Sequence, residues 1–420
     1  MGATGVHRSA WGLSRLAFGT AAFLAIAFAT PAADGAQALS PPQAASETRT
    51  APRARDLPGE AGLPTVAARP PQLTLSPANA ATTIPSPVDL TESSRLLVTR
   101  GAHLSRRVDP LSAHSDSITP ISSTAFQAYS IEISTDAPVL EIGFRAVGGR
   151  YLVWVDGHPT SLAPTSAPRD GAFYRLKVRF PGRGTHGVRF ESDESRFTRF
   201  TVSTTDGVVP ARAAGQRAVV IGDSFAEGAR ADARFLAFGQ TLCYLSGWTD
   251  CWVAGSGGTG YLATGASFPN RVKYRDRIVN DLTQWRPDVV VVTGGRNDGR
   301  FPPAQEQAEA LALFRQIRSA LPTSLLIATS LFPSSRAEAL SGTFVALSNA
   351  IRTSSSGLAD YYLDVVGSDA YITGNGDAGA PTGSGNADVL TSGDRVHPTQ
   401  AGHDELARQL FRRFRSQLPP

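Results

Sequence analysis

The sequence predicts two folded domains: a β-sandwich of the jelly-roll kind, followed by an α/β domain in which a parallel sheet lies between two layers of helices. Three observations predict this. The chain has 420 residues, more than one ordinary domain holds. Residues 89–208 form short runs that alternate apolar and polar side chains, as strands with one buried face do. Across residues 215–420, near-continuous apolar runs alternate with helical stretches, which is typical of a parallel sheet covered on both faces.

The residues before these domains are predicted to be a signal peptide and a linker. Residues 1–38 combine two early arginines, an apolar run over 16–29 and the small-x-small sequence Ala36-Gln37-Ala38, a pattern typical of a cleaved secretory signal. The apolar run is short for a membrane span, so we expect a secreted, periplasmic or cell-surface protein without stable membrane insertion, an uncleaved anchor being the alternative. Residues 39–88 are rich in Ala, Pro, Thr and Ser, which predicts a flexible linker.

Seven runs of β character, separated by Gly, Pro, Asp and Ser, predict the strands of the sandwich. They are "RLLVT", "AFQAYSIEIS", "VLEIGFRAV", "YLVWVDG", "FYRLKVRF", "HGVRFES" and "FTRFTVS". The fourth run contains Trp154, which alternation along a strand places in the core, stacking on a sugar being the alternative. The Asp156-Gly157 pair that ends this run predicts a hairpin turn.

The second domain is predicted to contain five strands, each followed by a helix. The strand runs are "RAVVIGDS", "CWVAG", "DVVVVTGG", "SLLIATS" and "YYLDVVG", and the helices are expected near 232–246, 272–285, 303–320, 336–353 and 400–416. Working residues of such sheets gather beyond the carboxyl ends of the strands. The residues that follow each strand are therefore the candidates for a functional site.

Composition narrows the range of partners. The formal charge is +4, but nearly all basic residues are arginines spread along the chain, and no basic block is interleaved with aromatics, so we expect no nucleic-acid binding. Two cysteines, Cys243 and Cys251, predict a disulfide in an exported chain, two free buried thiols being the alternative. No Cys or His pair has the spacing of metal ligands, so no metal site is predicted.

The strand ends of the second domain carry residues suited to acyl transfer. Ser224 follows the first strand, and Asp394 and His397 follow the fifth. A serine hydroxyl needs a base, and His397 lies three residues after Asp394, a spacing that lets the carboxylate hold one ring nitrogen while the other faces the serine. The other histidine of this domain, His403, lies in the first turn of the last helix and is interpreted as a packed or capping residue.

Donors for a developing oxyanion are also present at these strand ends. The backbone N–H groups of Ser224 and Gly258 and the side-chain amide of Asn297 converge if the first strand lies between the second and third, as in flavodoxin-like order. Taken singly, each residue also fits a helix start, a tight loop or a turn. Their combination on one edge of the sheet predicts an active site.

Four blocks, "GDSFAEG", "GSGGTG", "GGRND" and "DRVH", resemble those of the GDSL, or SGNH, hydrolase family over residues 217–418. The nucleophile elbow of the α/β-hydrolases is different, because it requires glycine where this chain has Ala226. The resemblance implies a flavodoxin-like three-layer domain and a serine ester hydrolase with no metal or organic cofactor. It implies that Ser224 is the nucleophile, His397 the base and Asp394 the acid that orients the base. It also implies that Gly258 and Asn297 are oxyanion donors, with Gly255 and Gly257 as alternatives to Gly258.

The substrate is less closely defined by the sequence. A β-sandwich before such a domain resembles two-domain carbohydrate esterases, which remove acetyl groups from polysaccharides. The polar, Gly-rich segment 371–392 predicts a wall for a hydroxylated substrate with Tyr371 as a stacking platform, an insertion without substrate contact being the alternative. Arg296 either binds an anionic group of the substrate or pairs with a neighbouring carboxylate.

These observations together predict an exported serine esterase that removes short acyl groups, with acetyl as the expected group, from a saccharide. Three alternatives remain open at this point. They are a lipase or arylesterase of broader acyl range, an acyltransferase with the same residues, and a carbohydrate-binding protein without activity.

Overall fold

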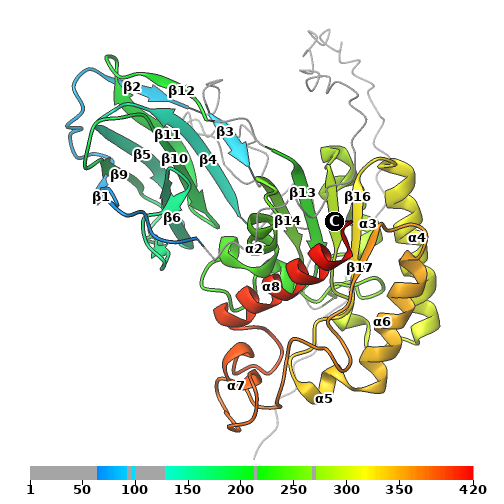
Figure 1. Cartoon of the computed structure of the whole chain (residues 1–420). Coiled ribbons are helices and arrows are strands. Elements are labelled where there is room, and N and C mark those ends of the chain that lie inside the picture. The colour runs from blue at the N-terminus through cyan, green and yellow to red at the C-terminus, as the bar shows by residue number, and fades with distance from the viewer. Residues whose placement is uncertain (1–63, 92–96, 101–127, 212–214, 267–270, 420) are drawn as a thin grey trace, which may run out of the picture. The chain divides into compact units, whose positions relative to one another are not determined.

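In the computed structural model, the described residues are 64–91, 97–100, 128–211, 215–266 and 271–419 (Figure 1). The predicted signal peptide, residues 1–38, and residues 39–63 of the predicted linker lie outside them. Within these ranges, no helix has both the length and the apolar character needed to cross a bilayer. An antiparallel β domain begins at Gln72 and an α/β domain at Arg217.

The first domain consists of two antiparallel sheets. One has the strand order β1-β9-β5-β11-β2, and the other has the order β12-β4-β10-β6-β7, in which β3 also pairs with β4 and β8 with β6. The strands are β1 (Gln72–Pro77), β2 (Pro87–Leu90), β3 (Val98–Arg100), β4 (Tyr129–Thr135), β5 (Val139–Arg145), β6 (Arg150–Val155), β7 (His158–Pro159), β8 (Thr165–Ser166), β9 (Phe173–Arg179), β10 (His186–Ser192), β11 (Arg196–Ser203) and β12 (Val208–Pro210). The predicted all-β domain is thus confirmed.

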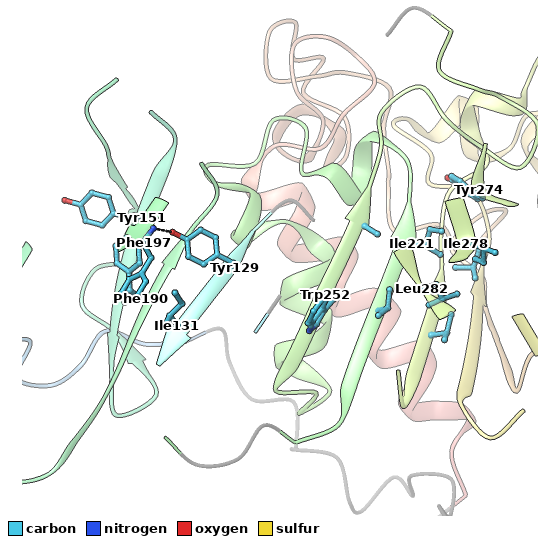
Figure 2. Close-up of a cluster of buried hydrophobic side chains, with 14 of the residues drawn as sticks. Tyr129, Ile131, Tyr151, Phe190, Phe197, Ile221, Trp252, Tyr274, Ile278 and Leu282 are labelled. Atoms are coloured by element: carbon cyan, nitrogen blue, oxygen red, sulfur yellow. Dashed lines mark hydrogen bonds between the residues drawn. The ribbon is translucent and has the colours of Figure 1, made fainter. Parts of the chain in front are cut away.

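Aromatic side chains from both sheets meet in the core of this domain. The ring centroids of Phe144 on β5 and Phe190 on β10 are 5.6 Å apart, and Tyr151 on β6 stacks on Phe190 at 5.8 Å. Figure 2 shows Tyr129 beside them, where its hydroxyl accepts a hydrogen bond from the backbone N–H of Phe197 at 3.0 Å. Contacts between strands of different sheets make this domain a sandwich, because each sheet buries one face against the other.

Trp154 lies on the other face of β6 from this core. Its neighbours Val153 and Val155 belong to the core, and alternation turns the indole to the opposite side. The ring is nevertheless only 6% exposed, because the Arg189 guanidinium lies 4.0 Å from its centroid and the indole belongs to a small buried cluster with Leu152 and Phe235. Its Nε1 donates to the Glu191 carboxylate at 2.7 Å. The indole is therefore buried as expected, but outside the sandwich core where the sequence placed it.

The sandwich begins earlier than predicted. The segment 39–88 was expected to be a linker, yet Gln72–Pro77 forms strand β1 and pairs in antiparallel register with β9, and β2 begins at Pro87. Both strands are edges of the first sheet, where one row of backbone groups needs no partner and prolines are tolerated. Each run holds only two apolar residues and has a proline at one end, so the Pro- and Ala-rich composition around them favoured a linker.

The second domain is built on a five-stranded parallel sheet with the order β14-β13-β15-β16-β17. Its strands are β13 (Arg217–Gly222), β14 (Asp250–Gly255), β15 (Val289–Val292), β16 (Leu325–Thr329) and β17 (Tyr361–Leu363). The first strand along the chain lies between the second and third, which is the flavodoxin-like order predicted from the sequence. The carboxyl ends of β13, β14 and β15 consequently lie side by side.

Helices cover both faces of this sheet, giving three layers (Figure 1). Along β13, Val219 and Ile221 belong to the cluster that contains the apolar side chains of α3, α4 and α6, and Figure 2 shows Ile221 with Ile278 of α3. Ala218 and Val220 point to the other face and to α2 and α8. The main helices are α2 (Phe238–Leu245), α3 (Tyr274–Asp281), α4 (Pro303–Ala320), α6 (Gly342–Ser355) and α8 (Gln400–Gln417).

Three of the predicted helices are interrupted. The stretch expected near 336–353 is divided into α5 (Arg336–Ala339) and α6, because the Ser341 side chain accepts a hydrogen bond from the Phe344 N–H and starts a new helix. Short 3₁₀ turns similarly precede α2, at Arg234–Leu236, and follow α3, at Thr283–Trp285. The helices expected near 303–320 and 400–416 are continuous.

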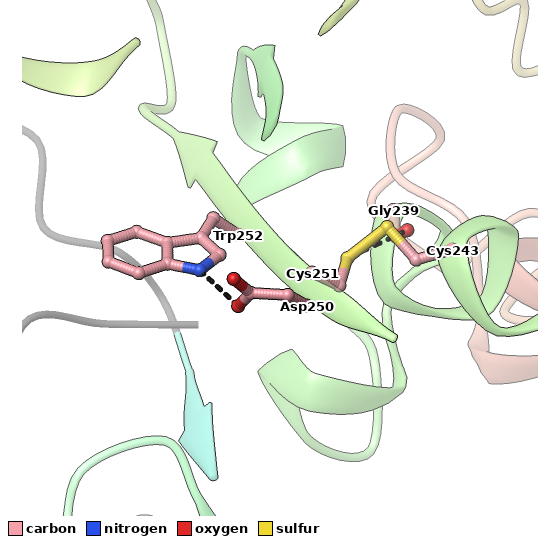
Figure 3. Close-up of a disulfide and its surroundings, with 5 residues drawn as sticks. All are labelled: Gly239, Cys243, Asp250, Cys251 and Trp252. Carbon is pink, nitrogen blue, oxygen red and sulfur yellow. Dashed lines mark hydrogen bonds between the residues drawn. A yellow bond between two sulfur atoms is a disulfide. The ribbon is translucent and has the colours of Figure 1, made fainter. Parts of the chain in front are cut away.

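A disulfide joins Cys243 of α2 to Cys251 of β14, as predicted (Figure 3). It closes a loop with a sequence separation of 8 residues. Replacing both cysteines by alanine should lower the free energy of unfolding by about 2.5 kcal/mol, because the open loop has more conformations in the unfolded chain. Chemical denaturation under non-reducing conditions measures this difference, and reduced wild-type protein should behave like the double variant. An unchanged denaturation midpoint would contradict the expected contribution.

Candidate active site

Ser224 is the first residue of a short helix, α1 (Ser224–Glu227), that directly follows β13. The buried Asp223 side chain caps this helix by accepting a hydrogen bond from the Phe225 N–H at 3.0 Å, and burial raises the pKa of Asp223 to about 6. The turn fits closely against the end of β14, since an added Cβ at Gly255 would lie 2.0 Å from the backbone nitrogen of Glu227. The serine is therefore held at the carboxyl edge of the sheet by strand, cap and close packing.

The structure brings Ser224, His397 and Asp394 into one hydrogen-bonded line. His397 Nε2 lies 2.8 Å from the Ser224 hydroxyl oxygen, and His397 Nδ1 lies 2.9 Å from Asp394 Oδ2. An ionised carboxylate only accepts hydrogen bonds, so Nδ1 carries the ring proton and Nε2 is free to accept the serine proton. The serine and histidine side chains are partly exposed, so a substrate can reach them.

Asp394 is held in its ionised form by several donors. Its Oδ1 accepts hydrogen bonds from the Ser392 hydroxyl at 2.8 Å and from the His397 N–H at 2.9 Å. Its Oδ2, besides facing the histidine ring, accepts one from Arg230 Nε at 2.9 Å. Partial burial alone would raise the pKa of Asp394, but the hydrogen bonds from His397, Arg230 and Ser392 outweigh it and hold that pKa far below its ordinary value.

The candidate oxyanion donors follow β13, β14 and β15, which are neighbouring strands of the sheet. Gly258 has a φ of 75°, a left-handed conformation that favours glycine. Within the described residues, the N–H groups of Ser224 and Gly258 donate to no protein group. The Asn297 amide, on the 3₁₀ turn Arg296–Asp298, donates one hydrogen bond to the Thr259 carbonyl at 2.9 Å, and its second N–H is available.

Asp298 holds the glycine loop against the asparagine turn. Its carboxylate accepts hydrogen bonds from the backbone N–H groups of Tyr261, Leu262 and Ala263 at 2.7 Å, 3.0 Å and 2.7 Å. The block after β14 and the block after β15 are thereby fixed to each other. The two segments that carry the candidate oxyanion donors thus form one unit.

Asn297→Ala should lower kcat for ester hydrolysis by about 10² to 10³-fold, because removal of one oxyanion donor has an effect of this size when the donor is aligned with the developing charge. KM should change little, since a ground-state carbonyl depends less on this donor. The matched control is Asn280→Ala, which removes an exposed amide on α3. Equal kinetics for the two variants would exclude Asn297 from the site.

His403 is not available as a base. Its side chain is buried, and its Nε2 donates to the Ala229 carbonyl at 2.9 Å. Burial lowers the pKa of His403 to about 4, so the ring stays neutral at ordinary pH. The interpretation of His403 as a packed residue at the start of α8 agrees with this position.

Arg296 pairs with a carboxylate of its own domain. Its guanidinium forms an ion pair with Glu338 and lies over the Phe344 ring, 5.3 Å from the centroid. It also donates to the Phe332 carbonyl at 3.3 Å. Of the two interpretations left open by the sequence, the structure favours pairing within the protein over binding of an anionic substrate group.

Tyr371 does not lie where the sequence reading placed it. Only 5% of the residue is exposed, and its hydroxyl donates to the Pro333 carbonyl at 3.0 Å. No ring face remains open for a sugar, so the prediction of a stacking platform is corrected. The tyrosine packs inward because Ile372 and Leu390 belong to the same buried apolar cluster.

The rest of the segment 371–392 is folded through its own turns. Asp388 accepts hydrogen bonds from the N–H groups of Thr382 and Gly383, and the short helix α7 (Ala387–Leu390) follows. Asp377 pairs with Arg395 Nε at 3.0 Å, which ties the segment to the turn between Asp394 and His397. Its role as a wall of a substrate site stays a prediction.

A buried carboxyl lies beneath this edge of the sheet. Glu306 of α4 is fully buried, and neither carboxyl oxygen has a hydrogen-bond partner among the described residues. Burial, together with the nearby Asp298 charge, raises the pKa of Glu306 from 4.5 to about 9. The folded protein therefore keeps this proton at pH values where the unfolded chain loses it, so stability is full below about pH 4.5 and decreases as the pH rises toward 9.

Glu306→Gln should raise the free energy of unfolding by about 3 kcal/mol at pH 7 and have little effect at pH 4.5, because the amide has no proton to lose. Urea denaturation at the two pH values measures the change. The matched control is Glu405→Gln on α8, since the half-buried Glu405 already has an ion-pair partner in Arg412. A stability gain that is the same at both pH values would contradict the raised pKa.

The comparisons with known proteins agree with this geometry. Residues 220–405 match the sequence model of the GDSL-like Lipase/Acylhydrolase family, and this range contains all three residues of the hydrogen-bonded line. The second domain is a GDSL-like lipase/acylhydrolase domain. This match indicates that the second domain is a carboxylic ester hydrolase. Among curated proteins, no sequence matches the chain.

Solved structures are similar to this chain over a length that includes both domains. A family two carbohydrate esterase from Cellvibrio japonicus is similar over 79% of this chain and 98% of its own, with a TM-score of 0.56 and 17% identity. A salicylyl-acyltransferase from a tetracycline biosynthetic pathway is similar over 79% of this chain and 97% of its own, with a TM-score of 0.56 and 16% identity. An acetyl xylan esterase from the rumen bacterium Butyrivibrio proteoclasticus is similar over 82% of this chain and 98% of its own, with a TM-score of 0.52 and 11% identity. Because the identities are this low, the structural similarity shows a common fold alone.

Three side chains around the GDSL-like site escaped the sequence analysis. Arg230 contacts the Asp394 carboxylate, and Glu227 and Arg271 contact the glycine loop after β14. Glu227 was visible inside the "GDSFAEG" block but had no assigned task. Nothing in the sequence distinguishes Arg230 or Arg271 from the many other arginines. Among the described residues, no group of three or more His, Cys, Asp or Glu side chains is arranged to hold a metal ion.

Proposed function

We propose that the GDSL-like domain hydrolyses short acyl esters, acetyl esters above all, on a saccharide, with Ser224 as the nucleophile. The observation that carries this proposal is the hydrogen-bonded line from Ser224 through His397 to Asp394. A serine hydroxyl becomes an effective nucleophile only when a base removes its proton, and the geometry supplies that base at hydrogen-bond distance.

In the first half of the reaction, Ser224 Oγ attacks the ester carbonyl carbon while His397 Nε2 takes the hydroxyl proton. Asp394 keeps the ring in the required tautomer and stabilises the imidazolium. The N–H groups of Ser224, Gly258 and Asn297 donate to the oxyanion of the tetrahedral intermediate. His397 then returns the proton to the leaving alcohol oxygen, the ester C–O bond breaks, and Ser224 carries the acyl group.

In the second half, water replaces the alcohol. His397 takes a proton from the water as its oxygen attacks the acyl carbon, and the same donors hold the second oxyanion. The proton then passes to Ser224 Oγ, which leaves, and the carboxylic acid is released. An alcohol in place of water would give an ester instead, so the same residues serve an acyltransferase, the second candidate function. The fold shared with a salicylyl-acyltransferase is the observation that favours it.

Two observations support a saccharide as the substrate. The two-domain architecture is shared with a family two carbohydrate esterase and an acetyl xylan esterase. The segment 371–392, many of whose residues are polar and exposed, is tied to the triad turn by the Asp377–Arg395 ion pair. Export is part of the proposal, because residues 1–38 have the pattern of a signal and a disulfide suits an oxidising compartment.

Purified protein should be assayed with p-nitrophenyl acetate, p-nitrophenyl octanoate and acetylated xylan, beside Ser224→Ala. Cleavage of the acetate and release of acetic acid from the xylan, with poor cleavage of the octanoate, is the expected result. Rates that rise with acyl length would favour a lipase. Turnover that depends on an added alcohol and yields a new ester would favour the acyltransferase. Binding of xylan without turnover of any ester would overturn the enzymatic proposal.

A further inference from the structure

Glu227 and Arg271 hold Gly257, the residue before the candidate oxyanion donor, through its backbone N–H and its carbonyl oxygen. Glu227 is the last residue of α1, and its Oε2 accepts a hydrogen bond from the Gly257 N–H at 2.6 Å. Arg271 Nη1 donates to the carbonyl oxygen of the same glycine. Arg271 Nη2 also donates to Glu227 Oε1 at 3.2 Å, so the two side chains support each other.

This pair lies directly beside the nucleophile. An added Cβ at Gly257 would lie 3.3 Å from the Cβ of Ser224, 2.6 Å from Arg271 and 2.7 Å from Glu227. The side chains of Arg271 and Glu227 are only 19% and 20% exposed, so water screens their interaction less than it screens a surface ion pair. A side chain at residue 257 would therefore displace the ends of both side chains of the ion pair.

The carbonyl of Gly257 and the N–H of Gly258 belong to one planar peptide unit. In a trans peptide they point in opposite directions, so a group that fixes the carbonyl also fixes the direction of the N–H. A charged donor on the carbonyl oxygen also withdraws electron density from the amide, which makes its N–H a stronger donor. The arginine contact therefore acts on the far side of the same peptide unit that presents the Gly258 N–H.

We propose that Glu227 and Arg271 are positioning residues of the oxyanion hole. Arg271 orients and polarises the Gly257–Gly258 peptide so that the Gly258 N–H stabilises the oxyanion, and Glu227 fixes the preceding peptide and the arginine. This inference rests on the proposed function of Ser224. Arginine suits the task because its planar fork donates to the glycine carbonyl and to the glutamate at the same time, which a lysine ammonium does with less geometric control. Neither side chain touches the reacting atoms.

A purely structural ion pair would have a different kinetic signature from a positioning pair. Loss of structure lowers the amount of active protein and reduces the apparent kcat in proportion to the unfolded fraction. Loss of oxyanion positioning lowers kcat of fully folded protein while KM for a neutral ester stays nearly constant, because the charge develops only in the transition state. External guanidinium can restore the positioning of the oxyanion donor, since it can occupy the space left by the arginine side chain.

The test compares Arg271→Ala, Arg271→Lys and Glu227→Gln with Arg275→Ala, whose arginine pairs with Glu309 instead of the glycine loop. With p-nitrophenyl acetate, kcat should fall by about 10 to 100-fold for Arg271→Ala, less than the loss of a whole donor, and less again for Arg271→Lys and Glu227→Gln. KM should stay within about twofold. Guanidinium, far below unfolding concentrations, should raise kcat of Arg271→Ala but not of Arg275→Ala.

The outcomes separate this inference from the proposed function. Inactive Ser224→Ala together with wild-type kcat in Arg271→Ala would overturn the positioning role and leave the esterase intact. An active Ser224→Ala would overturn the proposed function itself. If Arg271→Ala does not fold, Arg271→Lys and Glu227→Gln decide the question, and wild-type kcat in both overturns the inference. A rise in KM with unchanged kcat would assign Arg271 to substrate binding and also overturn it.

Discussion

Ser224→Ala is expected to lower kcat for ester hydrolysis by about 10⁴-fold or more, the largest effect of any single substitution in this protein. The variant keeps the oxyanion donors and the histidine, but no acyl group can be transferred to residue 224. Its fold should be unchanged, because the Asp223 cap and the packing of α1 do not use the serine hydroxyl. Steady-state kinetics with p-nitrophenyl acetate measure the loss.

The matched control for this change is Ser246→Ala, which removes a buried serine hydroxyl that has no hydrogen-bond partner among the described residues. That hydroxyl lies at the end of α2, outside the hydrogen-bonded line of the site. The control should keep wild-type kcat. If Ser224→Ala kept more than about a hundredth of the wild-type kcat, a covalent mechanism at Ser224 would be contradicted.

Asp394→Asn should lower kcat by about 10⁴-fold with little change in KM. The amide has nearly the shape of the carboxylate, but its NH₂ group cannot accept the proton of His397 Nδ1. The ring then adopts the other tautomer or turns, so Nε2 no longer accepts the serine proton. The substitution also removes the charge that Arg230 contacts at 2.9 Å.

Asp360→Asn is the control for this second change, because Asp360 is an exposed aspartate that pairs with Arg318 at 2.9 Å but precedes β17, at the opposite edge of the sheet from Ser224. It should leave kcat unchanged. Imidazole NMR can follow the tautomer directly: the Nδ1 proton of His397 should be visible in wild type and lost in Asp394→Asn. A reduction of kcat by less than tenfold would contradict the orienting role.

The second domain could be predicted closely from the sequence because its signals are local. The run of four valines, Val289–Val292, favours a strand buried on both faces because valine is β-branched, and it forms β15 in the centre of the sheet. The residues after each strand then share an edge, whatever the details of the helices. For that reason Ser224 and His397, which are 173 residues apart in the chain, could be expected to meet before any coordinates were known.

The misplaced features depend on contacts that sequence patterns do not encode. β1 is an edge strand whose partner, β9, lies about a hundred residues further along the chain. Tyr371 looked exposed because its loop is polar, yet its ring fills a place among Ile372 and Leu390. Arg271 contacts the Gly257 carbonyl from a later part of the chain, and nothing in the sequence distinguishes this arginine from the many others.

The central claim is that Ser224 forms the covalent intermediate, and a mechanism-based label tests it most directly. A fluorophosphonate ester should phosphonylate the Ser224 oxygen, with fluoride leaving and the hydroxyl proton passing to His397. Mass spectrometry of the intact protein should then show one adduct, and peptide mapping should place it on Ser224. An adduct on another serine, or none on Ser224 in protein that hydrolyses esters, would contradict the account.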